Sequence, residues 1–417
     1  MTKKRIYKAV ALSAMITSVT SIEASGYKLP EQSLNSVALG AAYVAHTTGA
    51  DTAYYNPARM GFLDRDRNYI EGSLTLVHLP SIDFEGAQYL PVPPSGVFLK
   101  GDGATKIENI GIGQLHYVSK DFDGFRFGFS LATPGGLSKR WDDPVEKTFA
   151  EEFSLRLIEA NPSISYRISD NIGIGGGVRI LYADGKVKSD GSDLGIVLSR
   201  DMDGDDIALG YNLALAISAP GDIDLAVTYR SKIDMKIEGH ASITAGKFNY
   251  SGGANVDLPL PASLSIAAAK TFDDRLTVEF VYERTFWSAY DKLDFDYDTK
   301  LPVMDTPLDK SWKDSNTYRI GLTYRYNDRL TLMGGYAYDE TPIPDRTMGY
   351  ELPDSDANIF SAGFRYRQTD DLSWGAAILY DSKKSRTLEL GENENGIIGE
   401  FDDGGALLTT VGFEYRF

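Results

Sequence analysis

The sequence contains no cysteine and only four histidines among its 417 residues. Without cysteine there is no disulfide framework, so packing and backbone pairing must hold the fold. The histidines, His46, His78, His116 and His240, show no metal-ligand spacing and have no evident nucleophile partner. We therefore expect no metal, no cofactor and no catalytic residue, and we do not expect an enzyme.

The sequence also lacks a long apolar run. After residue 24 no segment offers the roughly 20 uninterrupted apolar residues that a membrane-spanning helix requires. The apolar stretch at residues 9–19 is short, and four basic residues precede it within the first eight positions. With residues 22–24 as a cleavage site, this pattern predicts a signal peptide over residues 1–24 and an exported chain that starts at Ser25. Such a chain can span a membrane only with strands.

Basic residues are scarce relative to acidic ones. There are 42 Lys and Arg against 59 Asp and Glu, a formal charge of −17. Removal of the predicted signal peptide deletes four basic residues and one acid and takes the charge to −20. An acidic surface of this size argues against nucleic acid as a partner.

Alternation of apolar and polar side chains is the main positive signal. In the last twelve residues Leu407, Val411, Phe413, Tyr415 and Phe417 fall on one face of a strand, and mostly polar or small residues fall on the other. Residues 318–326 and 360–367 repeat the pattern, with aromatic and aliphatic side chains opposite arginines. One face suits lipid, and the other suits a wet or plugged lumen.

Short polar turns alternate with long polar connections along nearly the whole chain. The short turns lie at residues 121–124, 169–171, 220–222, 273–274, 327–328 and 369–371. The long connections lie at residues 80–105, 135–155, 185–206, 239–260, 292–313, 340–356 and 383–403. Thirteen connections predict an all-β fold, a 14-stranded antiparallel transmembrane β-barrel over residues 68–417. A soluble β-sandwich also alternates, but it does not explain the asymmetry between the two kinds of connection.

Residues 25–67 lack sustained alternation and carry small residues and turn formers. A fourteen-stranded barrel encloses a lumen too wide for its own side chains to fill. We therefore predict that residues 25–67 form an N-terminal hatch inside the barrel.

Several motifs along the chain resemble one known family, the outer-membrane transporters of long-chain fatty acids and hydrocarbons of the FadL type. They are Ser-Gly-Tyr-Lys-Leu at 25–29, Ala-Leu-Gly-Ala-Ala-Tyr at 38–43, Asn56-Pro57-Ala58, Leu-Pro-Leu-Pro-Ala-Ser-Leu at 258–264, Phe-Trp-Ser at 286–288, Tyr-Ala-Tyr-Asp-Glu-Thr-Pro-Ile-Pro-Asp at 336–345 and Pro-Asp-Ser-Asp at 353–356. The resemblance covers nearly the whole mature chain.

The resemblance implies a bacterial outer-membrane barrel that takes up hydrophobic compounds passively through the lipopolysaccharide layer. Ligand would meet an apolar groove between extracellular loops, pass to a deeper lumen pocket, and leave sideways after a change in the hatch. The expected partners are the hydrophobic ligand, outer-membrane lipid and lipopolysaccharide, and we expect a monomer. Long-chain fatty acids are favoured, with aromatic or alkane hydrocarbons second. A nonspecific porin, or an adhesive or structural barrel, is the alternative of a different class.

The predicted capture surface lies in the connection at residues 135–155. It holds Leu137, Trp141, Phe149 and Phe153 among charged residues. These side chains either bind an alkyl chain or pack this connection onto the barrel rim. By resemblance, Tyr27 is a candidate plug of the deeper pocket.

A fatty acid carboxylate in an apolar site requires a cation. Lys313 resembles a family position near the ligand head, and Lys186 is a second candidate, although Asp184 places an acid beside it. For both lysines a solvated charge at a strand end is the alternative.

The gating candidates are in the hatch and the third strand. Gly26 and the triplet Asn56-Pro57-Ala58 belong to the hatch motifs; Asn before Pro favours a turn. The family's lateral exit is attributed to a kink in the third strand, here near residues 125–133, and Gly128, Pro134 and Gly135 are compatible with a break in pairing. The alternative is that Pro134 and Gly135 simply open an extracellular loop.

Two further motifs are weak. Residues 201–206, Asp-Met-Asp-Gly-Asp-Asp, have the composition of a calcium loop but lack its sixth-position Gly and its final Glu, which favours a solvated acid cluster. The glycines at 173 and 175–177 miss the dinucleotide pattern and more simply allow close approach of the hatch or bending of a strand.

Overall fold

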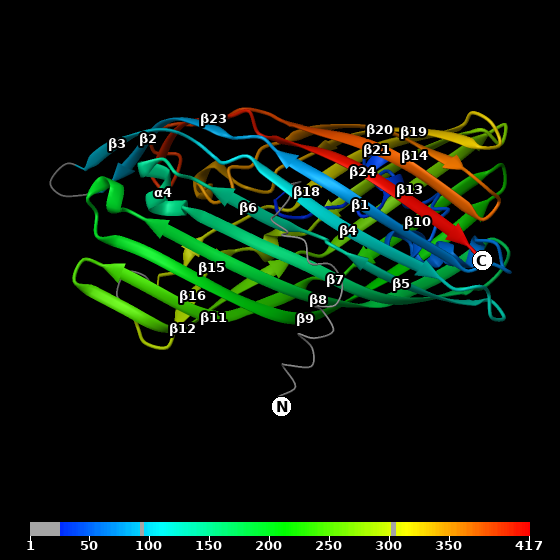
Figure 1. The fold of residues 1–417 in the computed structure, drawn as a ribbon, viewed down its shortest axis with the longest axis horizontal. Helices are drawn as coiled ribbons and strands as arrows, with labels where there is room; N and C mark the ends of the chain where they lie inside the picture. The colour runs from blue at the N-terminus through cyan, green and yellow to red at the C-terminus, as the bar shows by residue number, and fades with distance from the viewer. Residues whose placement is uncertain (1–25, 92–95, 302–305) are drawn as a thin grey trace.

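The computed structural model describes residues 26–91, 96–301 and 306–417, so the predicted signal peptide lies outside the described residues. Fourteen antiparallel strands form a closed barrel (Figure 1). They are β1 (Tyr69–Leu79), β4 (Glu108–Val118), β5 (Phe125–Ala132), β7 (Glu152–Arg167), β8 (Ile172–Asp190), β9 (Leu198–Ala219), β10 (Ile223–Arg230), β13 (Ser263–Phe272), β14 (Leu276–Thr285), β18 (Ser315–Arg325), β19 (Leu330–Asp339), β20 (Ala357–Arg367), β21 (Leu372–Lys383) and β24 (Gly405–Arg416). The barrel closes where β1 pairs with both β24 and β4.

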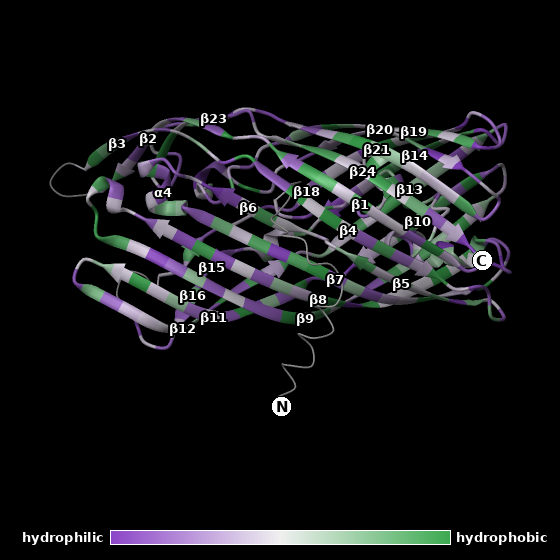
Figure 2. Ribbon diagram, viewed as in Figure 1, coloured by the Kyte–Doolittle hydropathy of each residue, from purple (hydrophilic) through white to green (hydrophobic). Residues whose placement is uncertain are grey.

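The predicted strand number, strand direction and facing of side chains are confirmed. All six predicted short turns fall between consecutive barrel strands, at the end that carries the C-terminus (Figure 1). Apolar and polar bands alternate along the strands (Figure 2). In β18, Ile320 is 43% exposed on the outer face while its neighbour Arg319 is 3% exposed on the inner face. A wet or plugged interior and a lipid-facing exterior explain this pattern.

The opposite end, which we call the long-loop end, carries additional structure (Figure 1). The elements that extend the barrel wall are β6 (Gly136–Arg140), β11 (Ile233–Ala245), β12 (Phe248–Leu260) and β16 (Phe295–Tyr297). A separate sheet contains β2 (Asp83–Leu90), β3 (Val97–Ala104), β22 (Arg386–Leu388) and β23 (Ile397–Asp402), and a second contains β15 (Lys292–Leu293) and β17 (Leu308–Asp309). The helices here are α4 (Pro144–Ala150) and the 3-10 turns η2 (Ser192–Leu194), η3 (Trp287–Ala289) and η4 (Asp345–Thr347).

Three predicted long connections were wrong in part. Residues 185–206 were expected to be a loop, but β8 and β9 continue through most of this range, with Lys186 opposite Asp203 and Lys188 opposite Asp201. Paired charges are compatible with a strand where its outer face meets water and not lipid. Residues 135–155 contain β6 and α4, and residues 239–260 belong to the β11–β12 hairpin. The acid cluster at 201–206 therefore lies in a strand.

The chain before β1 lies inside the barrel and is almost entirely buried. We call residues 26–68 the hatch. Its elements are α2 (Leu34–Ala38), α3 (Thr52–Tyr55) and the 3-10 helix η1 (Pro57–Phe62). Within the described residues, no helix has the length and apolar character needed to cross a membrane.

Candidate functional site

An apolar cavity lies between the start of the hatch and the long-loop elements. We call it the upper cavity. Its apolar lining includes Leu137, Phe153, Leu155, Val187, Met202 and Ile237. Small-molecule sites are mostly apolar. The upper cavity thus has the surface of a site for a hydrophobic ligand.

Tyr27 from the hatch forms one wall of the upper cavity. Its ring packs edge-on against Trp287 at 4.7 Å and lies 5.9 Å from Trp312, measured between ring centroids. Its hydroxyl donates to the carbonyl of Pro259, and burial raises its pKa well above the usual range. Gly26 has φ of +63°, and a Cβ there would lie 2.7 Å from Trp287. This close approach and the left-handed backbone explain why glycine precedes Tyr27.

The four predicted capture residues are divided between two environments. Leu137 and Phe153 line the upper cavity. Trp141 is fully buried and donates from its indole nitrogen to the carbonyl of Tyr350 at 2.9 Å. Phe149, on α4, lies 6.1 Å from the Tyr350 ring. Leu137 and Phe153 therefore face the space where a ligand fits, whereas Trp141 and Phe149 pack the long-loop elements together.

The structure changes the ranking of the candidate cations. Lys186 borders the upper cavity, but its ammonium is 3.1 Å from Glu152. Lys313 is exposed just before β18, outside the residues that line the cavity. Lys310, which the sequence reasoning missed, is 4% exposed, lines the cavity and is paired with Glu351. Lys310 is thus more buried than Lys186, the other lysine in the lining of the upper cavity.

A second, polar cavity lies deeper in the lumen, on the other side of Tyr27. We call it the lower cavity. Four cations line it, Lys28, Arg179, Arg230 and Arg319, together with the carboxylate of Glu283.

The charges of the lower cavity are only partly compensated at its surface. Lys28 is 2.8 Å from Glu283, and burial lowers the pKa of Lys28 while Glu283 opposes that shift. Glu159, behind the surface, accepts from both Arg179 and Arg230. Arg319 also pairs with Glu283, at 3.4 Å, so each of the four cations has a carboxylate partner, while Glu283 is the one carboxylate among the lining residues that the structure describes.

The third barrel strand breaks between its two halves. Ala132 pairs with Glu159, and Gly136 pairs with Arg156. Between these pairs, residues 133–135 of the third strand lie opposite only residues 157 and 158 of β7. On the other side, pairing with β4 covers only Leu115 to Val118, which leaves residues 108–114 of β4 without a strand partner here. Pro134 and Gly135 thus lie in a bulge within the wall and do not open a loop.

Gly128 lies below this bulge, where the strand is paired on both sides. A Cβ at Gly128 would lie 2.4 Å from the Ser163 hydroxyl, 2.6 Å from the Met60 sulfur and 2.8 Å from Ala53. Gly128 thus permits contact between hatch and wall, and the break in pairing lies at residues 133–135, not at Gly128.

The Asn56-Pro57-Ala58 triplet joins α3 to η1 deep in the hatch. Asn56 donates from its amide to the carbonyl of Val44 at 2.8 Å, and Pro57 starts η1. A Cβ at Gly175 on β8 would lie 2.6 Å from the backbone of Ala58. Of the glycines at 173 and 175–177, Gly173 and Gly175 face the hatch, whereas a Cβ at Gly176 or Gly177 would meet wall residues. The triplet contacts the wall and lines neither cavity.

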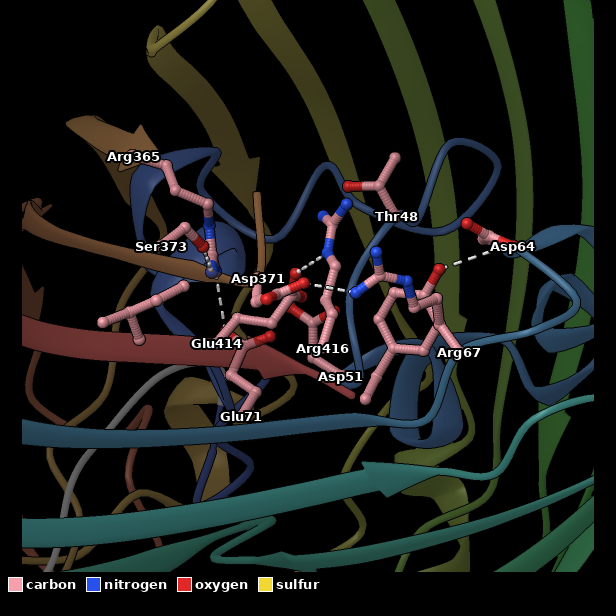
Figure 3. Close-up of polar contacts among 12 residues, drawn as sticks. Thr48, Asp51, Asp64, Arg67, Glu71, Arg365, Asp371, Ser373, Glu414 and Arg416 are labelled. Carbon is pink, nitrogen blue, oxygen red and sulfur yellow. Dashed lines mark hydrogen bonds and ion pairs between the residues drawn. The ribbon is translucent and has the colours of Figure 1, made fainter. Parts of the chain in front are cut away.

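Polar contacts tie the hatch to the wall at the short-turn end (Figure 3). Arg365 on β20 donates to Asn35 of the hatch at 3.1 Å and to Glu71 of β1 at 2.8 Å. Asp51 of the hatch and Glu414 of β24 complete the cluster (Figure 3). Burial raises the pKa of Asp51 to about 6, and Arg365 opposes this shift. Three carboxylates therefore surround Arg365 between hatch and wall, and one of them, Glu414, also accepts from Arg416 at 2.7 Å.

Two wall carboxylates hold the middle of the hatch. Glu279 on β14 accepts from the backbone N–H groups of residues 44–46 at 2.6, 2.6 and 3.2 Å. Asp224 on β10 accepts from Arg59 at 2.8 Å and lies 2.7 Å from the ring of His46. Charge-assisted bonds of this kind are about twice as strong as neutral ones. The hatch is therefore anchored on several sides of the barrel.

A model of the family described as outer membrane protein transport protein (OMPP1/FadL/TodX) matches residues 13–417. The chain belongs to this family. It is 24% identical over 457 aligned residues to the long-chain fatty acid transport protein of Salmonella typhi, with all of both chains covered. In solved structures, a Pseudomonas aeruginosa FadL homologue matches at a TM-score of 0.81 and 20% identity, over 94% of this chain and 99% of that one. The P. putida toluene transporter TodX matches at a TM-score of 0.70 and 18% identity, over 92% of this chain and 98% of that one.

FadL-family membership establishes an outer-membrane channel for hydrophobic compounds and not an enzyme. The two cavities and the bulge belong to this channel. Over the described ranges, no group of three or more His, Asp or Glu is placed to hold a metal ion.

Proposed function

We propose that this channel takes up long-chain fatty acids. In this proposal the chain enters at the long-loop end, occupies the upper cavity, passes Tyr27 to the lower cavity and leaves sideways through the third strand. The observation that carries the proposal is the lower cavity, whose lining contains four cations and one carboxylate among uncharged side chains. A ligand with an apolar tail and an anionic head matches the two cavities in order.

Transfer of the tail supplies the driving force for capture. Each methylene removed from water contributes about 0.8 kcal/mol, so an alkyl chain partitions into the apolar upper cavity without any energy source. The head then needs a cation, because an unpaired carboxylate is costly away from water. The cations of the lower cavity supply that partner.

The third strand supplies the exit. Pro134 of the bulge lines the lower cavity, and residues 108–114 of β4 have no strand partner beside it. A ligand in the lower cavity is therefore separated from the outer face of the barrel by the bulge and by the hatch residues that cover it.

Hydrocarbon uptake is the second candidate. Lys310, the most enclosed lysine of the upper cavity, is paired with Glu351, so that cavity accepts a neutral ligand without leaving a buried charge unpaired. TodX, one of the similar structures, is described as a toluene transporter. The named fatty acid transporters align over the full chain, which favours the first candidate.

Uptake of labelled oleate, methyl oleate, toluene and a small sugar by cells that carry the protein tests the proposal. Lys28→Met removes a cation of the lower cavity, so we expect the apparent affinity for oleate to fall at least fivefold while methyl oleate uptake changes less than twofold. Loss of one charge-assisted bond predicts an effect of this order.

Lys247→Met, on the exposed β11–β12 hairpin, is the matched control and should leave oleate uptake unchanged. Toluene entry without oleate entry would move the function to hydrocarbons. Entry of the sugar would identify a porin, and no entry of any solute would favour an adhesive or structural barrel.

A further inference from the structure

We infer that the side-chain amide of Gln32 is the latch that closes the lateral exit. Gln32 is fully buried in the hatch, and its amide nitrogen donates to the carbonyl of Thr133 at 2.7 Å. The N–H of Thr133 donates back to the amide oxygen of Gln32 at 2.7 Å. The inference rests on the proposed lateral route.

The amide of Gln32 takes the place of a missing strand. Thr133 begins the bulge, where the third strand has left β4 and its backbone groups need partners. A peptide group on a neighbouring strand would offer one donor and one acceptor, and a carboxamide offers the same pair. Gln32 therefore satisfies the backbone N–H and C=O of Thr133, which a neighbouring strand would otherwise satisfy.

The hatch residues before Gln32 continue this pairing along the bulge. The N–H of Leu29 donates to the carbonyl of Pro134 at 2.9 Å, and the N–H of Gly136 donates to the carbonyl of Tyr27 at 2.8 Å. Lys28 and Gly135 form the antiparallel bridge between these bonds. We call residues 26–32 the arm. The arm covers the edge that β4 leaves free.

The arm differs from the rest of the hatch in how it is held. Residues 35–62 are anchored by charged side chains of the wall, Arg365, Glu279 and Asp224. At the bulge, the arm is held by backbone groups and by the neutral amide of Gln32, and away from the bulge Lys28 pairs with Glu283 of β14 at 2.8 Å. A side chain can release both of its bonds by rotation, whereas a paired strand must move its backbone. Rotation of Gln32 therefore releases Thr133 while residues 35–62 stay anchored.

Gln32 also lies next to residues that line the lower cavity. The lining of the lower cavity includes residues on both sides of the latch, Lys28 and Leu29 of the arm and Pro134 of the bulge, and also Tyr55. The hydroxyl of Tyr55 accepts from the backbone N–H of Gln32 at 2.5 Å. A ligand that fills the lower cavity presses on the arm, the bulge and this tyrosine together, which places the latch between the ligand and the exit.

The test compares Gln32→Leu and Gln32→Glu with the wild-type protein in three measurements. These are oleate uptake rate, equilibrium oleate binding to the purified protein, and hydrogen exchange of the backbone amides of Thr133, Gly135 and Gly136. Gln32→Leu removes both latch bonds, and Gln32→Glu keeps the shape but loses the donor to Thr133. We expect both to raise the initial uptake rate at least fivefold and to accelerate amide exchange in the bulge, with binding changed less than twofold.

Gln88→Leu is the matched control, because Gln88 is also buried and donates to a backbone carbonyl, that of Asn395, at 2.6 Å. It lies in the sheet at the long-loop end and should leave all three measurements unchanged. Unchanged uptake in both folded Gln32 variants would overturn the latch, and so would a lower rate with unchanged binding. Failure of the wild-type protein to take up oleate would instead overturn the proposed function.

Discussion

At the scale of single residues, contact between the hatch and the wall depends on glycines that lack a Cβ. Gly175 faces the hatch backbone at Ala58, and Gly335 faces Leu39. In both places a Cβ would lie under 3 Å from backbone atoms, which cannot move aside as a side chain does. These glycines fix how closely the hatch sits against β8 and β19.

We predict that Gly175→Ala destabilises the protein by about 1–3 kcal/mol, because overpacking forces the backbone at Ala58 away from the wall. Urea unfolding in detergent micelles would measure the change. Gly111→Ala is the control, since a Cβ there meets nothing within 4 Å. Equal stability of the two variants would show that the hatch can move away from β8 without a loss in the free energy of unfolding.

Part of the site could be predicted from single residues, and part could not. Alternation with the outward Val178 and Ile180 places Arg179 in the lumen, so this cation could have been found from the strand pattern. Lys310 and Gln32 lie in segments without periodicity. Their neighbours come from distant parts of the sequence, Glu351 and Thr133, which no local pattern reveals.

At the scale of elements, α4 carries a buried acid in the long-loop end. Glu146 is fully buried, and in the part of the chain that the structure describes neither of its carboxylate oxygens has a hydrogen-bond partner. Burial raises the pKa of Glu146 to about 7. The folded protein therefore binds more protons than the unfolded chain between pH about 4.5 and about 7, and the free energy of unfolding falls as the pH rises through this window.

Glu146→Gln should remove this pH dependence. At pH 8 we expect the variant to be more stable than the wild type by roughly 1–3 kcal/mol, because a neutral amide avoids the cost of a buried unpaired charge. At pH 4 the two should be equal, since both side chains are then uncharged. Urea unfolding at both pH values measures this, with exposed Glu85→Gln as the control. A variant that is less stable at pH 8 would contradict the argument.

The elements show where sequence patterns are informative. Turns at the short-turn end were predicted well because tight connections require specific turn residues between strands with a lipid-facing side. The continuation of β8 and β9 was missed because both faces of these strands lie outside lipid, and the apolar pattern that lipid imposes ends there. The bulge was located only approximately, since its pairing depends on the hatch.

At the scale of the whole molecule, the hatch converts a wide barrel into a closed channel. The wall places charged side chains in the lumen, among them Arg365, Glu279 and Asp224, and the hatch provides partners for them. Without the hatch these groups would face water, which a wide lumen can admit. The lumen surface is therefore compatible with two states, plugged and hydrated.

Deletion of residues 26–67 should convert the protein into a water-filled pore. We expect the deletion variant to pass a small sugar and to conduct ions in planar bilayers, whereas the wild-type protein does neither, because fourteen strands leave a lumen that their side chains cannot fill. The variant should also unfold at lower urea concentration, since the buried contacts of the hatch are lost. A heat-modifiable band on electrophoresis would show that the barrel still forms. A folded variant that stays closed would mean that the long-loop elements, and not the hatch, obstruct the lumen.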